Sequence, residues 1–296
     1  MTRAFSPLRY PGGKQILARV LSKFIQMNGR EGGIYAEPYA GGCGAGLSLL
    51  FSEHISSLLI NDADRSIYAF WWSILNETDA FLKLLRDTPR TVREWDKQRA
   101  IYTDSSGVGL LELGFAAFYL NRCNRSGIIA NGGVIGGRDQ TGRWKIDARY
   151  NPQALSARIS RIALYAHRIR LTNLDAIQFL RVHVSAAKTV ERCFVYLDPP
   201  YHDKGSGLYL DYYDSDDHVA LAHYLEEAQF LWVLTYDNVP AIRRLYSTLR
   251  RSSFTLSYSA KERRTGNELM VFHPELKVPN GWVKRLPASE LTLAAG

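Results

Sequence analysis

The stretch CFVYLDPPY, residues 193–201, combines an apolar run with an abrupt polar end. The run is typical of a strand that is buried on both faces, as in a parallel sheet covered by helices. Pro199 and Pro200 have a fixed φ and no N–H, so they end the strand and hold their neighbours extended. Open α/β sheets bind ligands beyond the carboxyl ends of their strands. The stretch therefore predicts an α/β fold with a ligand site at Asp198.

The polar end of this stretch has the chemistry of a site for a flat amine. Asp198 and the neighbouring backbone carbonyls accept hydrogen bonds, and Tyr201 offers a π-face. An amino group on an aromatic ring, such as the exocyclic amine of a base, matches both features. The alternative is a turn at Pro199 and Pro200, with Asp198 as a cap and Tyr201 packed on the surface. For these residues alone, both interpretations stay open.

The chain is basic, with 37 Lys+Arg against 29 Asp+Glu in 296 residues, a formal net charge of +8 and a pI near 9.3. Because the excess is spread over arginine-rich stretches, it favours a polyanionic partner. Cys43, Cys123 and Cys193 are odd in number and lack metal-ligand spacing, so we expect reduced thiols and no metal. No apolar stretch reaches the ~18 residues that span a bilayer, and residues 1–10 lack the apolar core of a signal peptide. We expect a soluble, cytoplasmic protein.

Short apolar segments alternate with amphipathic segments at both ends of the chain, which predicts a mostly parallel sheet covered by helices on both faces. Strands are expected at residues 35–37, 57–61, 169–173, 194–197, 231–235 and 270–273. Helices are expected at residues 15–27, 66–76, 176–184, 216–228 and 240–248. The fold class is therefore α/β.

The strand signal disappears in residues 78–150. Helical segments are expected there at residues 92–102 and 109–121, followed by a loop rich in glycine and arginine. A segment of ~70 residues is too long for an ordinary loop and is typical of a functional insertion. We therefore expect residues 78–150 to be a mainly helical inserted domain within a core made of residues 1–77 and 151–296.

Residues 37–46, EPYAGGCGAG, follow the first expected strand and lead into a helix near Leu47. The glycines let the backbone approach a ligand closely, and a helix N-terminus favours partial negative charge. The dinucleotide fingerprint is not matched, because Cys43 stands where its second glycine would follow Gly41. Glu37 would also repel a diphosphate. The loop therefore predicts a nucleotide-like cofactor that has no diphosphate.

Three other charged residues are candidates for the same site. Asp62 follows a strand, where an acidic residue binds ribose hydroxyls in such folds; the alternative is a helix N-cap. Asp175 has two equal interpretations, contact with an adenine amine or the cap of the following helix. Lys14 ends the segment LRYPGGK at residues 8–14. On its own it is interpreted as a solvated lysine, unless it pairs with a cofactor carboxylate.

The expected insertion carries guanidinium, ammonium and amide side chains. Arginine and asparagine read base edges, and basic side chains neutralise phosphates. The alternative is a solvated basic loop. The candidates for contacts with nucleic acid are Asn121, Arg122, Asn124, Arg125, Arg138, Arg143 and Lys145.

Taken in order, four motifs resemble those of a DNA adenine N6-methyltransferase of the Dam type, in the α-ordered group. The motifs are YPGGK at residues 10–14, EPYAGG at 37–42, the acidic strand end at Asp62, and DPPY at 198–201. Similar elements at Tyr236-Asp237 and at residues 264–268 extend the resemblance to nearly the whole chain. It implies a Rossmann-like S-adenosylmethionine-dependent methyltransferase sheet with a mainly helical inserted target-recognition domain.

The resemblance implies S-adenosylmethionine as methyl donor and double-stranded DNA as substrate, without a metal. Asp198, Pro199, Pro200 and Tyr201 match the family's catalytic motif. The target adenine would be flipped out of the duplex and stacked on Tyr201. The positions that match the family's cofactor contacts are Tyr10, Lys14, Glu37, Pro38, Tyr39, Gly41, Gly42, Asp62, Asp198 and, more loosely, Asp175.

The insertion departs from the family pattern. Many relatives carry Asn-Arg-Thr followed by a Phe-Asn-Gly type element, whereas residues 121–127 read NRCNRSG. The recognition sequence is therefore not transferred, and a cognate restriction enzyme as partner is left open. The alternative functions are an inactive DNA-binding module with this fold, and methylation of an RNA adenine or a protein glutamine.

Overall fold

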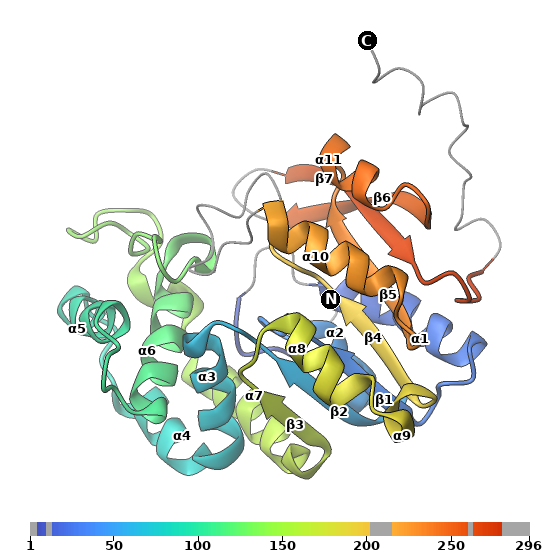
Figure 1. The fold of residues 1–296 in the computed structure, drawn as a ribbon. Coiled ribbons are helices and arrows are strands. Elements are labelled where there is room, and N and C mark those ends of the chain that lie inside the picture. Colours follow the sequence, from blue (N-terminus) through green and yellow to red (C-terminus); the bar gives the residue numbers. More distant parts are fainter. Residues whose placement is uncertain (1–4, 10–13, 202–214, 260–262, 280–296) are drawn as a thin grey trace.

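A computed structural model describes residues 5–9, 14–201, 215–259 and 263–279, and these contain a single seven-stranded sheet. Its strands are β1 (Gly33–Glu37), β2 (Ile55–Asn61), β3 (Ile169–Thr172), β4 (Cys193–Leu197), β5 (Leu231–Asp237), β6 (Arg250–Ser259) and β7 (Arg263–Phe272). They lie in the order β3-β2-β1-β4-β5-β7-β6 (Figure 1). Neighbours are parallel except β7, which is antiparallel to β5 and β6. The chain order reverses between β1 and β4, and such switch points bind ligands.

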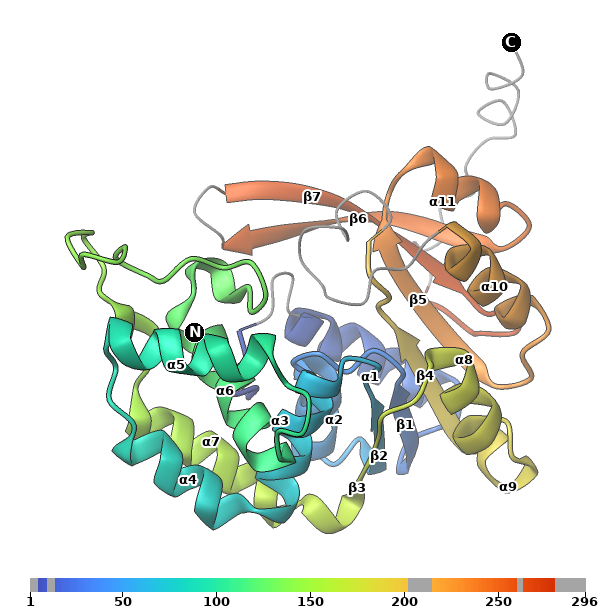
Figure 2. The same cartoon turned by 60° about the vertical axis from the view of Figure 1, so that its left-hand side comes forward.

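Helices cover both faces of this sheet. They are α1 (Ala18–Met27) after a 3-10 turn at Lys14–Leu17, α2 (Gly44–Phe51), α3 (Arg65–Asn76), α4 (Thr78–Asp87), α5 (Val92–Thr103), α6 (Leu110–Cys123), α7 (Pro152–Leu164), α8 (Ala176–Phe179) with a π-helical turn at Leu180–Val184, α9 (Ala187–Val190), α10 (Ser215–Glu226) and α11 (Pro240–Leu245). Figure 2 shows α1 and α2 on one side of the sheet and α8, α10 and α11 on the other.

Side chains alternate between the two faces along each central strand. Tyr35 and Phe194 belong to the hydrophobic cluster beneath α1, α2 and α3, whereas Ala36 and Val195 belong to the cluster beneath α8, α10 and α11. Because both clusters are apolar, the central strands have continuous apolar sequences. The predicted α/β fold with helices on both faces is confirmed.

Three helices and one strand were not predicted from the sequence: α4, α7, the single turn of α9, and β6. Helix α4 begins only two residues after α3 ends, so the two helices form one uninterrupted pattern in the sequence. Helix α7 begins at an Asn151 cap with Pro152 in its first turn, a start signal that the sequence analysis passed over. Strand β6 lies at the edge of the sheet and begins with the polar run Arg250-Arg251-Ser252-Ser253. Edge strands carry such polar residues, which weakens their sequence signal.

The helices of residues 78–150 share a hydrophobic cluster with the sheet. Helix α6 is buried from Leu113 to Cys123 and crosses α3 so closely that a Cβ on Gly114 would lie 2.4 Å from the Ala69 carbonyl oxygen. Phe118 of α6 stacks on Phe70 of α3 at 5.9 Å between ring centroids. The segment is mainly helical, as expected. One continuous hydrophobic cluster joins this segment to the sheet. That the segment is a separate domain stays a prediction.

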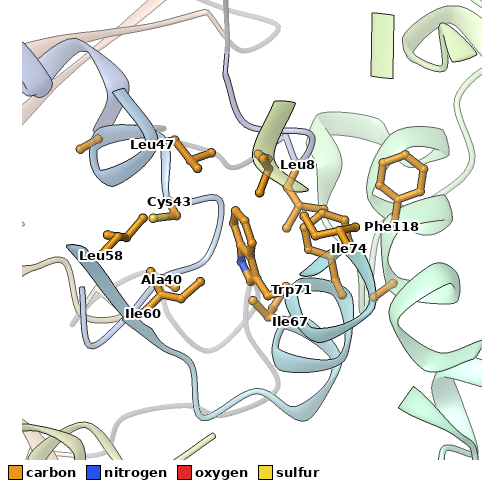
Figure 3. Close-up of a cluster of buried hydrophobic side chains, with 14 of the residues drawn as sticks. Leu8, Ala40, Cys43, Leu47, Leu58, Ile60, Ile67, Trp71, Ile74 and Phe118 are labelled. Carbon is orange, nitrogen blue, oxygen red and sulfur yellow. The ribbon is translucent and has the colours of Figure 1, made fainter. Parts of the chain in front are cut away.

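Trp71 connects this helical region to the loop after β1. Figure 3 shows its indole with Ala40 and Ile60 on one side and Ile74 and Phe118 on the other. The indole is fully buried, and its Nε1–H donates to the Gly41 carbonyl oxygen at 2.9 Å. The position of the glycine-rich loop therefore depends on the packing of α3 and α6.

The thiols of Cys43, Cys123 and Cys193 are buried and form no disulfide. Within the described ranges, no helix is both long enough and apolar enough to cross a membrane.

Candidate active site

The glycine-rich loop lies between β1 and α2, at the switch point of the sheet. Gly41 and Cys43 both have left-handed backbone conformations, with φ of 42° and 45°. Gly46, in the first turn of α2, has no room for a side chain, because a Cβ would lie 2.8 Å from Cys43 Sγ and from Leu58 Cδ1. The close packing at Gly46 thus fixes one tight loop at the end of β1, in which Cys43 keeps a strained left-handed conformation.

Glu37, the last residue of β1, binds the backbone of this loop. Its side chain is buried, and Oε1 accepts hydrogen bonds from the Gly46 N–H at 2.9 Å and the Tyr35 hydroxyl at 3.1 Å. Burial raises the pKa of Glu37 to about 7, although hydrogen bonds from Cys43 and Gly46 act to lower it. The carboxyl group is therefore part of the loop's internal structure.

Asp62 fixes the other side of the loop. Its Oδ2 accepts the Gly41 N–H at 2.8 Å, and its Oδ1 accepts the Asp64 N–H at 3.1 Å. The helix-cap alternative for Asp62 is wrong, because Asp64 caps α3 by accepting the Ser66 N–H. The side chain of Asp62 is partly exposed at the carboxyl end of β2, where its proposed ribose contact stays a prediction.

Asn61 joins three strand ends and was missed by the sequence analysis. Its Nδ2 donates to the carbonyl oxygens of Pro38 and Leu174, and its Oδ1 accepts from the Thr172 hydroxyl and the Leu174 N–H. It is fully buried. Nothing in the sequence marks this role, since asparagine after a strand is also an ordinary turn residue. Asn61 holds the edge on which Asp62 lies.

Asp198 lies at the carboxyl end of β4, with 25% of its side chain exposed. Its Oδ1 accepts a hydrogen bond from the Thr235 hydroxyl of β5 at 2.9 Å, and Thr235 also contacts the Tyr196 hydroxyl at 2.7 Å. Pro199 is buried and Pro200 is partly buried. The carboxylate is thus oriented by the neighbouring strand, at the position the sequence predicted.

Lys14 approaches Asp198 from the other end of the chain. Its ammonium lies 3.4 Å from Asp198 Oδ1, 2.8 Å from the Tyr201 hydroxyl and 2.7 Å from Glu268 Oε2. The Tyr201 hydroxyl also donates to Glu268 Oε1. The interpretation of Lys14 as a solvated lysine is wrong, because its side chain is 6% exposed. We call Lys14, Asp198, Tyr201 and Glu268 the catalytic-edge cluster.

Burial and neighbouring charges shift the pKa values of two members of the catalytic-edge cluster, Asp198 and Tyr201. Burial raises the pKa of Asp198; Lys14 acts to lower it and Glu268 to raise it. Burial and the charges of Asp198 and Glu268 raise the pKa of Tyr201. Perturbed groups gathered at one strand edge are typical of an active site. The turn alternative for residues 198–201 does not explain why three distant elements meet there.

Three of the predicted DNA contacts are turned into the protein, which contradicts a direct role in reading bases. Asn121 is fully buried, donates to the carbonyl oxygens of Arg9 and Gly127 and accepts the Arg9 N–H at 2.7 Å. Asn124 donates to the Ile128 and Ile129 carbonyl oxygens and accepts the Trp95 Nε1–H at 2.6 Å. Their amides hold the loop after α6 in place.

Arg122 is likewise buried, with 9% exposed. Its Nε donates to the Arg149 carbonyl oxygen at 2.8 Å and its Nη1 to the Pro7 carbonyl oxygen at 3.3 Å. Burial, followed by the charges of Arg9 and Arg158, lowers the pKa of Arg122 to about 9. The side chain fastens the N-terminal segment to the helical region.

The other four predicted DNA contacts are on the surface. Arg125, Arg143 and Lys145 are exposed, and the Arg143 guanidinium lies over the exposed Trp144 ring. Arg138 forms a two-pronged ion pair with Asp96 of α5, at 2.9 and 2.8 Å. Three of the four therefore have guanidinium or ammonium groups outside any ion pair between described residues.

The remaining predicted cofactor contacts divide into three groups. Tyr10 lies outside the described residues. Asp175 is an exposed N-cap of α8 that accepts the N–H groups of Ile177 and Gln178, so its capping interpretation holds. The positions gathered around the switch point are Glu37, Pro38, Tyr39, Gly41, Gly42, Asp62 and Asp198.

No set of His, Cys, Asp and Glu residues suited to a metal occurs in the described part of the chain.

Comparison with known proteins gives one family. Residues 10–265 match the sequence model described as D12 class N6 adenine-specific DNA methyltransferase. No curated protein matches the chain. One matching solved structure is a conserved hypothetical protein of Streptococcus pyogenes, with 11% identity and a TM-score of 0.34 over 86% of this chain and 96% of that chain. That structural likeness is too low to support any argument about fold or function.

Proposed function

The chain belongs to the family of D12 class N6 adenine-specific DNA methyltransferases, and on that premise we propose that it transfers a methyl group from S-adenosylmethionine to the N6 amine of an adenine flipped out of duplex DNA. The observation that carries this proposal is the orientation of Asp198. A partly exposed carboxylate, oriented by Thr235 and followed by rigid prolines and an aromatic ring, is suited to a planar amine.

The surroundings of the glycine-rich loop fit S-adenosylmethionine, which carries a sulfonium cation, a ribose and no phosphate. Asp62 and Asp198 present carboxylates on either side of β1, and they favour a cation and hydroxyl groups over a diphosphate. When bound, this cofactor supplies a methyl group that is already activated by the sulfonium. The residues proposed to hold it are Tyr10, Lys14, Glu37, Pro38, Tyr39, Gly41, Gly42, Asp62, Asp175 and Asp198.

The protein's task is then to prepare the nitrogen. The N6 lone pair of adenine is delocalised into the ring, so the amine is a poor nucleophile. Hydrogen bonds from the amine to Asp198 and to the Pro199 carbonyl oxygen favour a pyramidal nitrogen with its lone pair directed outward. Thr235 keeps the carboxylate in one orientation, and such positioning supplies much of the rate. The raised pKa of Asp198 also makes it a better acceptor for the proton that the methylated amine loses.

Extraction of the base costs a few kcal/mol, which stacking on Tyr201 helps offset. The exposed cations Arg125, Arg143 and Lys145 are proposed to contact the DNA, with Arg138 available if its pair with Asp96 opens. Asn121, Arg122 and Asn124 are not proposed as base contacts, because their polar groups already bind the protein backbone.

A methylation assay with three substrates tests the proposal. The purified chain is incubated with S-adenosylmethionine carrying a labelled methyl group and with duplex DNA, RNA of the same sequence, or a glutamine-rich protein. We expect label in DNA alone, recovered as N6-methyladenine. Label only in RNA or protein would contradict the proposal. No transfer, together with no detectable binding of S-adenosylmethionine by calorimetry, would favour an inactive DNA-binding module.

Long-read sequencing of DNA from cells that express the chain then identifies which adenines are modified. That experiment gives the recognition sequence, and with it the cutting specificity that a cognate restriction enzyme would need.

A further inference from the structure

Glu268 of β7 is a buried carboxylate next to the catalytic tetrapeptide. It is 1% exposed and lies opposite Asp237 of β5 in the sheet. Its two oxygens accept hydrogen bonds from the Lys14 ammonium, at 2.7 Å, and from the Tyr201 hydroxyl. A buried carboxylate is costly unless it is paired, so these contacts require a fixed arrangement.

Two carboxylates compete for the single ammonium of Lys14. Glu268 Oε2 lies 2.7 Å from Nζ, whereas Asp198 Oδ1 lies 3.4 Å away, beyond a strong charge-assisted hydrogen bond. Lys14 is thus bound closely by Glu268 and forms a longer ion pair with Asp198. As a result, the ammonium makes no short contact with the acceptor that a substrate amine needs.

Glu268 also fixes the ring of Tyr201. The hydroxyl of Tyr201 donates to Glu268 and accepts from Lys14 at 2.8 Å, and the Lys14 ammonium lies 5.3 Å from the ring centroid. Tyr201 follows two prolines, which fix the backbone that leads to it but leave its side-chain torsions variable. A bond at the far end of the ring removes that freedom.

We propose that Glu268 is a positioning residue for methyl transfer: it keeps Lys14 from binding Asp198 more closely and orients the Tyr201 ring on which the adenine stacks. This inference rests on the proposed function. It assigns to β7 a role in the reaction that the tetrapeptide alone does not supply.

The decisive variant is Glu268→Gln, which keeps the shape of the side chain and removes its charge. Lys14 then moves to Asp198, its only remaining carboxylate in the catalytic-edge cluster, and occupies the acceptor for the amine. We expect kcat to fall about 100-fold, as for a misplacement of ~1 Å, with the KM for DNA within about threefold of wild type. Thermal unfolding of the purified variant checks that it folds.

Removal of the lysine from this variant tests whether kcat rises or falls. In Lys14→Met/Glu268→Gln no ammonium reaches Asp198, so at saturating cofactor kcat should rise above that of Glu268→Gln. A purely structural role for Glu268 predicts the opposite, since each change would add its own damage. A double variant slower than Glu268→Gln would overturn the inference.

A second readout does not depend on methyl transfer. With 3-fluorotyrosine placed at position 201, 19F NMR reports the environment and ionisation of that ring. In Glu268→Gln the resonance should shift and broaden, and the phenol should ionise at lower pH because one neighbouring negative charge is gone. An unchanged resonance and titration would overturn the positioning role. Wild-type protein that fails to methylate DNA would overturn the proposed function and would leave this NMR result to decide the geometry.

Discussion

The catalytic-edge cluster and the last turn of α6 both contain buried polar residues, but these residues bind different partners. In the catalytic-edge cluster, Lys14, Tyr201 and Glu268 bind one another's side chains across elements that are distant in sequence. In the last turn of α6, Asn121 and Arg122 bind mainly backbone carbonyl oxygens. Both regions carry motifs that the resemblance singles out.

The difference separates side chains that build the fold from side chains available for chemistry. An amide that binds backbone groups satisfies the polar groups of an irregular loop, which would otherwise be costly to bury. Asp198, which lies at a strand end among titratable side chains, has a pKa raised chiefly by burial, and such a carboxylate can exchange partners when a ligand arrives. The predictions below test this distinction, beginning with the largest effect.

Asp198→Ala removes from the catalytic-edge cluster the carboxylate that is proposed to bind the substrate amine. We expect kcat for methyl transfer to fall by at least about 10³-fold, because the amine loses its charged acceptor. The melting temperature should stay near that of wild type, since Lys14 keeps its contact with Glu268. Asp87→Ala, which removes an exposed carboxylate from α4, is the matched control and should leave both quantities unchanged. Activity retained by Asp198→Ala would refute its catalytic assignment.

Asn121→Ala tests the opposite region. The change leaves the N–H and C=O of Arg9 and the carbonyl of Gly127 without their partner, so we expect a loss of about 4 kcal/mol in the free energy of unfolding. Urea denaturation followed by circular dichroism measures this loss. If stability were unchanged while the preferred DNA sequence altered, Asn121 would be a base contact after all.

Glu37→Gln tests whether the glycine-rich loop behaves like the catalytic-edge cluster. Burial raises the pKa of Glu37 from 4.5 to about 7, so between these pH values the folded chain keeps a proton that the unfolded chain has lost. The free energy of unfolding therefore falls by about 3 kcal/mol as the pH rises from about 4.5 to about 7.

The glutamine variant lacks this proton and still accepts the Gly46 N–H. It should match wild type near pH 4.5 and exceed it in stability at pH 8. Paired denaturation curves across this range measure the difference, and a difference independent of pH would show that Glu37 does not titrate in the fold.

The sequence predicted the central strands because a strand buried on both faces needs an uninterrupted apolar run, as in residues 193–197. It missed β6, whose edge position tolerates arginine and serine. The position of residues 198–201 at the end of β4 was predictable for a similar reason, since a strand end and its polar residues are adjacent in the chain. The fold class was therefore readable from local pattern.

The role of Glu268 could not be predicted from such local patterns. It meets Lys14 across 254 positions, and no local spacing encodes such a contact. The end of α6 was misinterpreted for a different reason. From Leu113 onward this helix is buried on all sides, so its sequence has no polar face to show where Asn121 and Arg122 point. Residue type indicates what a side chain can bind, and the packing decides what it does bind.

Arg125→Ala gives the smallest effect and separates the exposed cations from their buried neighbours. Because the side chain is exposed, the free energy of unfolding should change by less than about 0.5 kcal/mol. DNA affinity should fall by about tenfold or less, and the slope of log affinity against log salt should decrease by about 1 if Arg125 neutralises one phosphate.

Arg138→Ala is the control. The ion pair with Asp96 already engages the Arg138 guanidinium, so the effect of this change on DNA binding should be smaller. A changed sequence preference in Arg125→Ala, without a change in salt slope, would make Arg125 a base contact. Equal effects of the two arginines would show that a surface ion pair does not withhold a cation from DNA.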